Sequence, residues 1–224
     1  TGGEALGLAL PTGRRLTLLA QSLLFSAAVA VGAMVIGAMA GLYLEQVHHP
    51  VASLLRWGTI TLFAVPAYIH ALAWSAGLRV LTRWLTPLAG ASLPVSGWGV
   101  SWWVQTMALL PAAFALSWLG WRCIDPTMIE IARLQQPARR VFWRIMVPLA
   151  APYLGAGAGF LFVLSLLDYT IPSLFQTNVY ALEVLAEFSA SGDPLRAMLI
   201  SLPLVAGCLA VVTLSLRQIR HVAL

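Results

Sequence analysis

Five long apolar stretches constrain the fold of this chain more than any other feature. Each has about 20 residues or more, which in a helix is the length needed to cross a hydrocarbon core of about 30 Å. A bilayer offers no water to backbone polar groups, so a helix must pair them internally. The sequence therefore predicts an all-α, polytopic membrane protein with about five transmembrane helices, over residues 16–44, 56–78, 97–121, 150–175 and 195–216.

Composition excludes a soluble domain. Of the 224 residues, 60% are hydrophobic and only 9% are charged, whereas soluble domains carry about 25% charged residues. The net charge of +5 comes entirely from arginine, because the sequence has no lysine. In so apolar a chain, this surplus favours cytoplasmic loops of a membrane protein over a nucleic-acid surface. Cys123 and Cys208 lie far apart in the sequence and are expected to be small apolar fillers.

Smaller features mark individual stretches. Gly37 and Gly41 belong to a small-residue surface of the first stretch, which is suited to close helix contact. Residues 79–96 are predicted to be an irregular connection because they contain Pro87, Gly90 and Pro94. His48 and His49 do not predict a metal site, since adjacent residues project in different directions and no third ligand is in view.

One long polar stretch lies between the third and fourth apolar stretches and has the sequence DPTMIEIARLQQPARRVFWRIMVPLAAP. Asp125, followed by proline, is typical of a helix N-cap, and Thr127 with Glu130 is typical of a capping box. These signals predict a short helix that runs to about Gln135. Pro137 is expected to end it, because proline lacks an N–H and disfavours α geometry in the preceding residue.

A second short helix is predicted over residues 138–146 and is expected to end at Pro148. Three- and four-residue spacing places Arg140 and Arg144 on one side of it. The same spacing places an apolar group on another side, made up of Val141, Phe142, Ile145 and Met146.

This polar stretch resembles a known motif. Glu130-x-Ala132, followed by an arginine-rich helix and Ile145-x-Val147-Pro148, is similar to the cytoplasmic EAA loop of permease subunits of binding-protein-dependent ABC importers. In that family, the loop forms a short coupling helix seated in a cleft of the ATPase subunit. The chain departs from the pattern in two ways: Gln136 replaces the usual glycine, and the interval that follows is one residue shorter. The alternative is a basic amphipathic loop between membrane helices with no docking role.

The resemblance implies an architecture and a set of partners. It implies a type I importer permease with a fold like that of the methionine importer, and one transmembrane domain over residues 1–224. Two such subunits, or fused halves, would form the pathway, two ATPase subunits would bind the cytoplasmic loops, and a binding protein would deliver the solute. The chain itself would be no enzyme and hold no cofactor, since ATP would bind the partner subunit. The residues expected to dock the ATPase are Glu130, Ile131, Ala132, Arg133 and Leu134, supported by Arg140 and Arg144.

Arginine distribution predicts the orientation. If the EAA-like loop is cytoplasmic, the inside segments hold eight of the thirteen arginines and the outside segments hold five, which agrees with the positive-inside rule. We therefore expect a multi-pass protein of a bacterial-type inner membrane with its C-terminus in the cytoplasm. The first 15 residues contain no signal peptide, and an outside start would call for a further membrane helix upstream. The chain is thus expected to lack an upstream helix or to be one half of a larger permease.

Three ionisable residues are candidates for the translocation pathway. His70 lies within the second stretch, where an ionisable group is a functional hypothesis, although a neutral His bonded to a neighbouring helix is equally consistent. Asp168 and Tyr169 belong to the run LLDYTIPSLF, which resembles the corresponding helix end in the ferric-iron branch of these permeases. Ferric iron is therefore the first expected solute, with sulfate, molybdate and thiamine as alternatives. Asp168 could equally bond a neighbouring helix or loop.

Three other classes of protein were weighed. An intramembrane enzyme would need a nucleophile with a base, or a ligand cluster, and the sequence shows neither. A secondary transporter would more often show two related halves with broken helices. A membrane scaffold without transport would explain the glycine-rich helices but not the capped, proline-punctuated loop.

Overall fold

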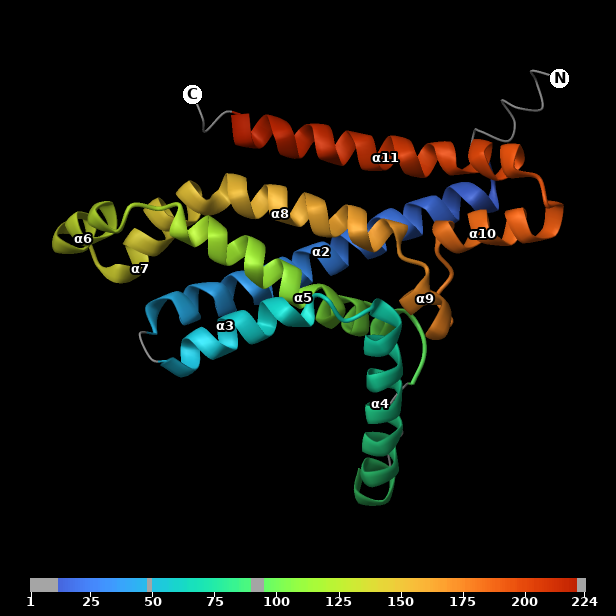
Figure 1. Cartoon of the computed structure of the whole chain (residues 1–224), viewed down its shortest axis with the longest axis horizontal. Helices are drawn as coiled ribbons and strands as arrows, with labels where there is room; N and C mark the ends of the chain where they lie inside the picture. Colours follow the sequence, from blue (N-terminus) through green and yellow to red (C-terminus); the bar gives the residue numbers. More distant parts are fainter. Residues whose placement is uncertain (1–11, 48–49, 90–94, 221–224) are drawn as a thin grey trace. The chain divides into compact units, whose positions relative to one another are not determined.

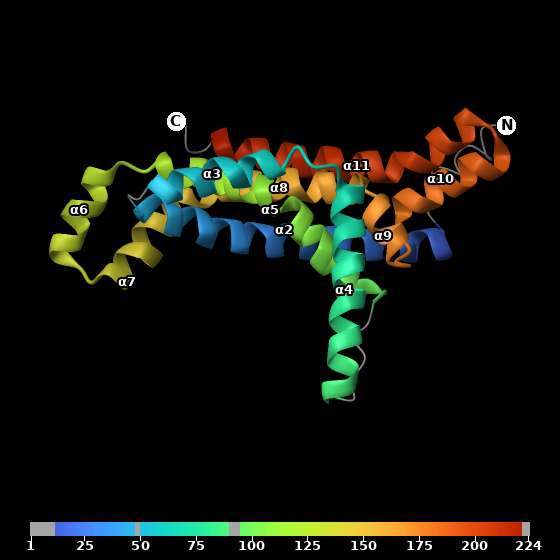
Figure 2. The same ribbon diagram turned by 60° about the horizontal axis from the view of Figure 1, so that its bottom comes forward.

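The computed structural model describes residues 12–47, 50–89 and 95–220. These residues form helices joined by short turns and contain no strand (Figures 1 and 2), which confirms the predicted all-α class. The helices are α2 (Arg14–Gln46), α3 (Pro50–Leu62), α4 (Ala67–Ala89), α5 (Trp98–Arg122), α6 (Pro126–Gln135), α7 (Ala138–Val141), the π-helical segment η1 (Phe142–Met146), α8 (Val147–Leu167), α9 (Thr170–Leu174), α10 (Tyr180–Ser191) and α11 (Pro194–Arg220).

Four of the described helices are long and apolar enough to cross a membrane, and the number is five if α3 and α4 form one broken span. The four spans are Arg14–Gln46, Trp98–Arg122, Ala138–Leu167 and Pro194–Gln218. Three of them coincide with predicted stretches to within a few residues, whereas Ala138–Leu167 both begins and ends earlier than the predicted stretch 150–175. The chain is therefore a multi-pass membrane protein, as predicted.

The prediction of a single helix over residues 56–78 is wrong. Helix α3 ends at Leu62 and α4 begins at Ala67, with Pro66 between them. The chain ends α3 in a tighter turn, in which the N–H of Phe63 donates to the carbonyl of Ile60, three residues back (3.1 Å). Proline disfavours α geometry in the residue before it, so the chain leaves the helix there. The predicted irregular connection is also shorter than expected, since α4 continues to Ala89 and takes Pro87 into its last turn.

Two further corrections concern the span Ala138–Leu167. The helix that begins at Ala138 does not end at Pro148 but continues to Leu167. Segment η1 precedes this proline and has wider turns, in which the Val147 N–H donates to the Phe142 carbonyl, five residues back. The regular hydrogen bonds between residues four apart are therefore already replaced before Pro148, which has no N–H to donate. The predicted helix over residues 150–175 is in turn broken between α8 and α9.

The chain divides into two compact units. The first comprises the described residues of Thr1–Val29, Val65–Ala108 and Phe162–Val211, and the second those of Ala30–Ala64, Leu109–Leu161 and Val212–Leu224. Each unit has its own buried apolar cluster.

In the first unit, α10 is bound to α2 and α11 around Tyr180. The Tyr180 hydroxyl donates to the Ile200 carbonyl (2.8 Å), and its backbone N–H donates to the Ser22 hydroxyl (2.7 Å). On the same helix, Glu187 forms ion pairs with Arg15 (3.0 Å) and Arg196 (2.7 Å). A solvated face was the simplest expectation for Glu187 and Glu183, but both are half-buried and ion-paired, the latter with Arg14 (3.8 Å).

In the second unit, α2 lies against α5 through Gly37 and Gly41, as the small-residue surface predicted. A Cβ at position 37 would lie 2.7 Å from the Ala113 carbonyl carbon, so only glycine permits this approach. The indole N–H of Trp121 donates to the Ala38 carbonyl (3.0 Å). The apolar cluster beneath the polar loop consists of Trp121, Ile124, Val141, Met146 and Ala150.

Candidate functional site

Helix α6, the predicted coupling helix, begins at a capped N-terminus. One carboxylate oxygen of Asp125 accepts hydrogen bonds from the Thr127 N–H (2.8 Å) and the Thr127 hydroxyl (2.7 Å). Both bonds stabilise the carboxylate and so hold the pKa of Asp125 below its ordinary value. The bond from the Thr127 hydroxyl makes the larger contribution. The cap at Asp125 is thus confirmed. The capping box is not, because the Thr127 hydroxyl donates to Asp125, and no bond within the described loop links it to Glu130.

Helix α6 ends where predicted. The backbone of Gln136 is extended (φ −140°, ψ 149°), its N–H donates to the Ala132 carbonyl (3.0 Å), and Pro137 is extended as well. Because φ of Gln136 is negative, this position does not need the glycine that is usual in the related motif. The break between α6 and α7 also accommodates the shorter interval, since the two helices are not continuous (Figure 2).

The outer face of α6 is apolar although the helix itself contains no buried residue. Ile129 and Ala132 contact the apolar cluster beneath the loop. Met128, Ile131 and Leu134, spaced three residues apart, are 51%, 60% and 87% exposed. Residues at this spacing lie on neighbouring positions of a helix surface. They form what we call the α6 stripe, defined as Met128, Ile131 and Leu134. Of the predicted docking residues, Ala132 therefore faces inward, and Met128 was missed although its spacing indicated it.

The charged residues of the loop are available to a partner. Glu130 and Arg133 are exposed on α6, and no ion pair within the described part of the chain involves either of them. Arg140 and Arg144, which were expected to support docking, are also exposed, and the apolar side of their helix is packed inward as predicted. The loop thus presents an apolar stripe flanked by a surplus of positive charge.

A polar cluster lies at the end of α5, just before the loop in the sequence. The Trp118 indole N–H donates to the Glu45 carboxylate, and the Arg122 guanidinium lies 3.8 Å from the same carboxylate and 5.1 Å from the indole ring. Arg56 donates to the carbonyls of Leu44 (2.5 Å) and Val47 (3.0 Å) at the C-terminal end of α2. These contacts join residues far apart in the sequence, and sequence analysis identified only the arginines, as cytoplasmic charges.

Asp168 occupies the break between α8 and α9 in the first unit. One of its carboxylate oxygens accepts the Thr170 N–H (2.8 Å), and the other accepts the side-chain amide of Gln105 (3.3 Å). Gln105 also donates to the Ser165 carbonyl (3.3 Å). Asp168 therefore bonds a neighbouring helix and the following turn, which is the structural alternative weighed above. Sequence analysis missed Gln105, although a lone amide in an apolar stretch was a usable signal.

The other two pathway candidates are not joined to Asp168 by hydrogen bonds within the described residues. Tyr169 is exposed and precedes the first residue of α9. His70 is half-buried on α4, and its Nε2 atom is buried without a hydrogen-bonding partner among the described residues. His48 and His49 lie outside the described residues. Within them, no three His, Cys, Asp or Glu side chains are placed to hold a metal ion.

Comparison with known proteins defines the class of fold. The chain has the fold of the membrane-spanning permease of ABC importers, as predicted. One similar solved structure is the MetNI methionine ABC transporter in inward-facing conformations, with 15% identity, a TM-score of 0.68, and coverage of 94% of this chain and 99% of that one. Another is an amino acid ABC transporter with histidines, with 16% identity, a TM-score of 0.63, and coverage of 92% of each chain. No family model and no curated protein matches the sequence. At these identities, the likeness defines the fold alone.

Proposed function

We propose that this protein is the permease subunit of a type I ABC importer and that α6 docks on a separate ATPase subunit. The α6 stripe carries the proposal, because it leaves three large apolar side chains exposed on a capped helix outside the spans. Burying such a side chain fully is worth about 1.5–3 kcal/mol. Docking would bury all three, with Glu130 and Arg133 free to pair with the partner.

ATP would be bound and hydrolysed by that partner, so the permease contributes neither a catalytic residue nor a cofactor. The arginine-rich loop favours a partner cleft bordered by carboxylates. When the ATPase pair closes on ATP, the two docked loops would move together and favour the outward-open state. The loop can transmit this movement because α7, η1 and α8 follow one another in a single span from Ala138 to Leu167, so displacing its start displaces the whole span.

The arrangement in the membrane follows from the same proposal. With α6 in the cytoplasm, the C-terminus is cytoplasmic too, and the protein lies in a bacterial-type inner membrane. A second permease copy or fused half would complete the pathway, and a binding protein would deliver the solute from outside. Ferric iron is the first solute to test, on the strength of the LLDYTIPSLF run, followed by sulfate, molybdate and thiamine. Asp168, Tyr169 and His70 remain the proposed pathway residues.

The decisive experiment is co-purification with a co-expressed candidate ATPase subunit, using the parent, Leu134→Ala and the matched control Leu62→Ala. Leu62 is also exposed, but it lies on α3 and outside the loop. We expect the parent and the control to retain the ATPase and Leu134→Ala to lose most of it. Equal recovery with Leu134→Ala would refute the docking role of α6. If even the parent recovers no ATPase, the protein is better explained as a membrane scaffold.

A further inference from the structure

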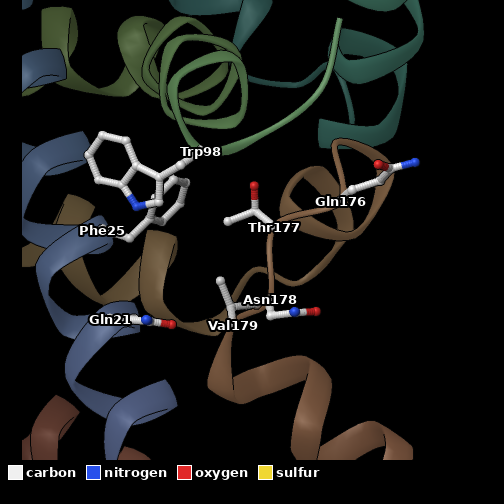
Figure 3. A pocket seen from close by; sticks show the side chains of 7 residues that line it. All are labelled: Gln21, Phe25, Trp98, Gln176, Thr177, Asn178 and Val179. Atoms are coloured by element: carbon white, nitrogen blue, oxygen red, sulfur yellow. The ribbon is translucent and has the colours of Figure 1, made fainter.

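Two of the pockets in the described chain differ in character. The one in the first unit, beside Trp98, has a volume of about 370 Å³. Figure 3 shows that the Thr177 hydroxyl and the amides of Gln176 and Asn178 point away from it, so these groups select no ligand there. The other pocket is larger, about 530 Å³, and all of its lining residues belong to the second unit. We call it the α2–α8 groove, after the two helices that line most of it.

Helix α2 supplies one wall of the groove through a single face of its last turns. The lining residues of α2 recur at intervals of one, three and four positions, which places them on one side of a helix. They are Val35, Ala38, Met39, Leu42, Tyr43 and Gln46. From position 35 to position 46 a helix rises roughly 16 Å at 1.5 Å per residue. This is about the depth of one leaflet, because the whole hydrocarbon core is about 30 Å thick.

The opposite wall is aromatic near the docking loop and aliphatic farther into the span. It consists of Trp121, Phe142, Trp143, Val147 and Leu154. The rings of Phe142 and Trp143 meet edge to face with centroids 5.1 Å apart, and the Trp121 ring lies 6.3 Å from that of Phe142. Trp121 is buried, and its indole N–H is already bonded to the Ala38 carbonyl. The buried part of this wall therefore presents apolar surface, which suits a hydrocarbon chain.

The two ends of the groove differ in polarity. Tyr43 and Gln46 lie at the end of α2, and Trp143 lies at the start of the opposite span, beside the docking loop. Tyr43 and Trp143 are 69% and 61% exposed, and aromatic side chains with polar tips are typical of the level of lipid headgroups. The far end is formed by Val35 and Leu154, which are apolar. This division matches an amphiphile, with its chain at one end and its headgroup at the other.

Arg139 adds a positive charge at the polar end. It precedes Trp143 by four residues, a spacing that places two side chains on the same side of a helix. Arg139 is exposed, and no ion pair within the described part of the chain involves it. The nearby carboxylate of Glu45 is already engaged by Trp118 and Arg122. The polar end therefore favours an anionic headgroup, because an arginine can bind a phosphate through two parallel hydrogen bonds.

We propose that the α2–α8 groove binds one anionic phospholipid, with an acyl chain between α2 and α8 and the phosphate beside Arg139. Its placement in the cytoplasmic leaflet rests on the proposed function, which puts the docking loop in the cytoplasm. Binding itself does not require an ATPase, so the lipid site and the permease function can fail separately. A lipid held there would contact η1, the segment that joins the docking loop to its span.

The test uses the purified, delipidated full chain in detergent, with dioleoyl phosphatidylglycerol and dioleoyl phosphatidylcholine as competing probes. Native mass spectrometry measures how much of each lipid the protein retains. We expect one saturable site on the parent that prefers phosphatidylglycerol. Arg139→Gln should weaken phosphatidylglycerol binding about fivefold, the value of one arginine near an anionic lipid surface, and leave phosphatidylcholine binding unchanged. The matched control Arg83→Gln, at an exposed arginine on α4, should behave as the parent.

A second pair of variants tests the position of the acyl chain. Ala38→Phe places a ring in the groove and should lower retention of both lipids. The matched control Leu24→Phe, at an exposed position of α2 outside the groove, should retain both as the parent does. Thermal unfolding shows whether each variant is folded. If Ala38→Phe does not fold, Arg139→Gln and its control decide the question alone.

Several results would overturn the proposal. Equal retention of the two lipids by the parent would do so, as would parental phosphatidylglycerol binding by Arg139→Gln. The measured masses also give the oligomeric state. If Ala38→Phe converts a dimer of the chain into monomers without changing lipid retention, the groove is a subunit interface and not a lipid site. Preferential phosphatidylglycerol binding by a parent that recovers no ATPase would support the lipid site and count only against the proposed function.

Discussion

Replacing Gly37 by alanine tests the close contact between α2 and α5 in the second unit. The added Cβ would lie 2.7 Å from the Ala113 carbonyl carbon and 2.8 Å from the Phe114 backbone nitrogen. These are backbone atoms of α5, which cannot yield as a flexible side chain can. Ala113 and Phe114 are both buried, so the two helices must separate.

Two opposing effects determine the expected change in the free energy of unfolding. Overpacking a close contact costs about 1–3 kcal/mol. Alanine recovers about 0.5–1 kcal/mol of helix propensity relative to glycine, so we expect a net loss of about 1–2 kcal/mol. For a chain of this size, 1 kcal/mol corresponds to about 2–4 °C, so Tm should fall by about 2–8 °C. Thermal unfolding in nanodiscs, followed by tryptophan fluorescence, measures this shift.

Gly58→Ala is the matched control, because a Cβ at position 58 on α3 meets nothing within 4 Å. It should gain the helix propensity without the clash and leave Tm unchanged or raise it by up to about 4 °C. A Tm for Gly37→Ala equal to or above that of the parent would refute the packing argument. One helical turn further along α2, a Cβ at position 41 would lie 3.2 Å from the backbone nitrogen of Trp118, whose indole binds Glu45. We therefore expect Gly37→Ala also to weaken recovery of the ATPase.

Three further predictions concern charged residues. Glu130→Ala should change the unfolding free energy by less than about 0.5 kcal/mol, because Glu130 is exposed. It should nevertheless lower ATP-driven uptake by reconstituted complexes. Uptake at the parental rate would contradict the coupling role of Glu130. Because hydrogen bonds lower the pKa of Asp125, its contribution to α6 should be complete above the unfolded pKa and decline as pH falls below about 4 through the folded pKa. Amide exchange in α6 should accelerate over that range, and Asp125→Asn should remove the dependence. Glu187→Gln should lower Tm by about 2–4 °C, because it removes partly exposed ion pairs with Arg15 and Arg196 that are together worth about 1 kcal/mol. High salt should reduce the difference in Tm between variant and parent.

The sequence alone was sufficient for features that depend on short stretches. The length and apolarity of a span are properties of one segment in a bilayer, so α2, α5, α8 and α11 could be located without knowledge of their neighbours. The limits of α6 were also predictable, because a cap at Asp125 and a proline at position 137 act within one or two turns. The resemblance of the loop to a permease motif likewise rested on consecutive residues.

Proline was where local reasoning failed. Pro66 separates α3 from α4, Pro87 lies inside α4, and Pro148 lies inside a continuous span. The local signal is the same in each case, a missing N–H and a crowded carbonyl. Whether the chain leaves the helix depends on how the preceding turn can rearrange. Segment η1 provides that rearrangement before Pro148, and its apolar side is packed in the cluster beneath the loop.

Only the tertiary structure decided which side chains meet and which remain available. The α6 stripe faces outward because Ile129 and Ala132 are already in contact with the cluster beneath the loop. Gln105 reaches Asp168 across 63 positions of sequence, and Tyr180 binds Ser22 across 158. A residue's own sequence neighbourhood encodes its helix and its depth in the membrane, but its distant partners are chosen by the packing of whole helices against one another.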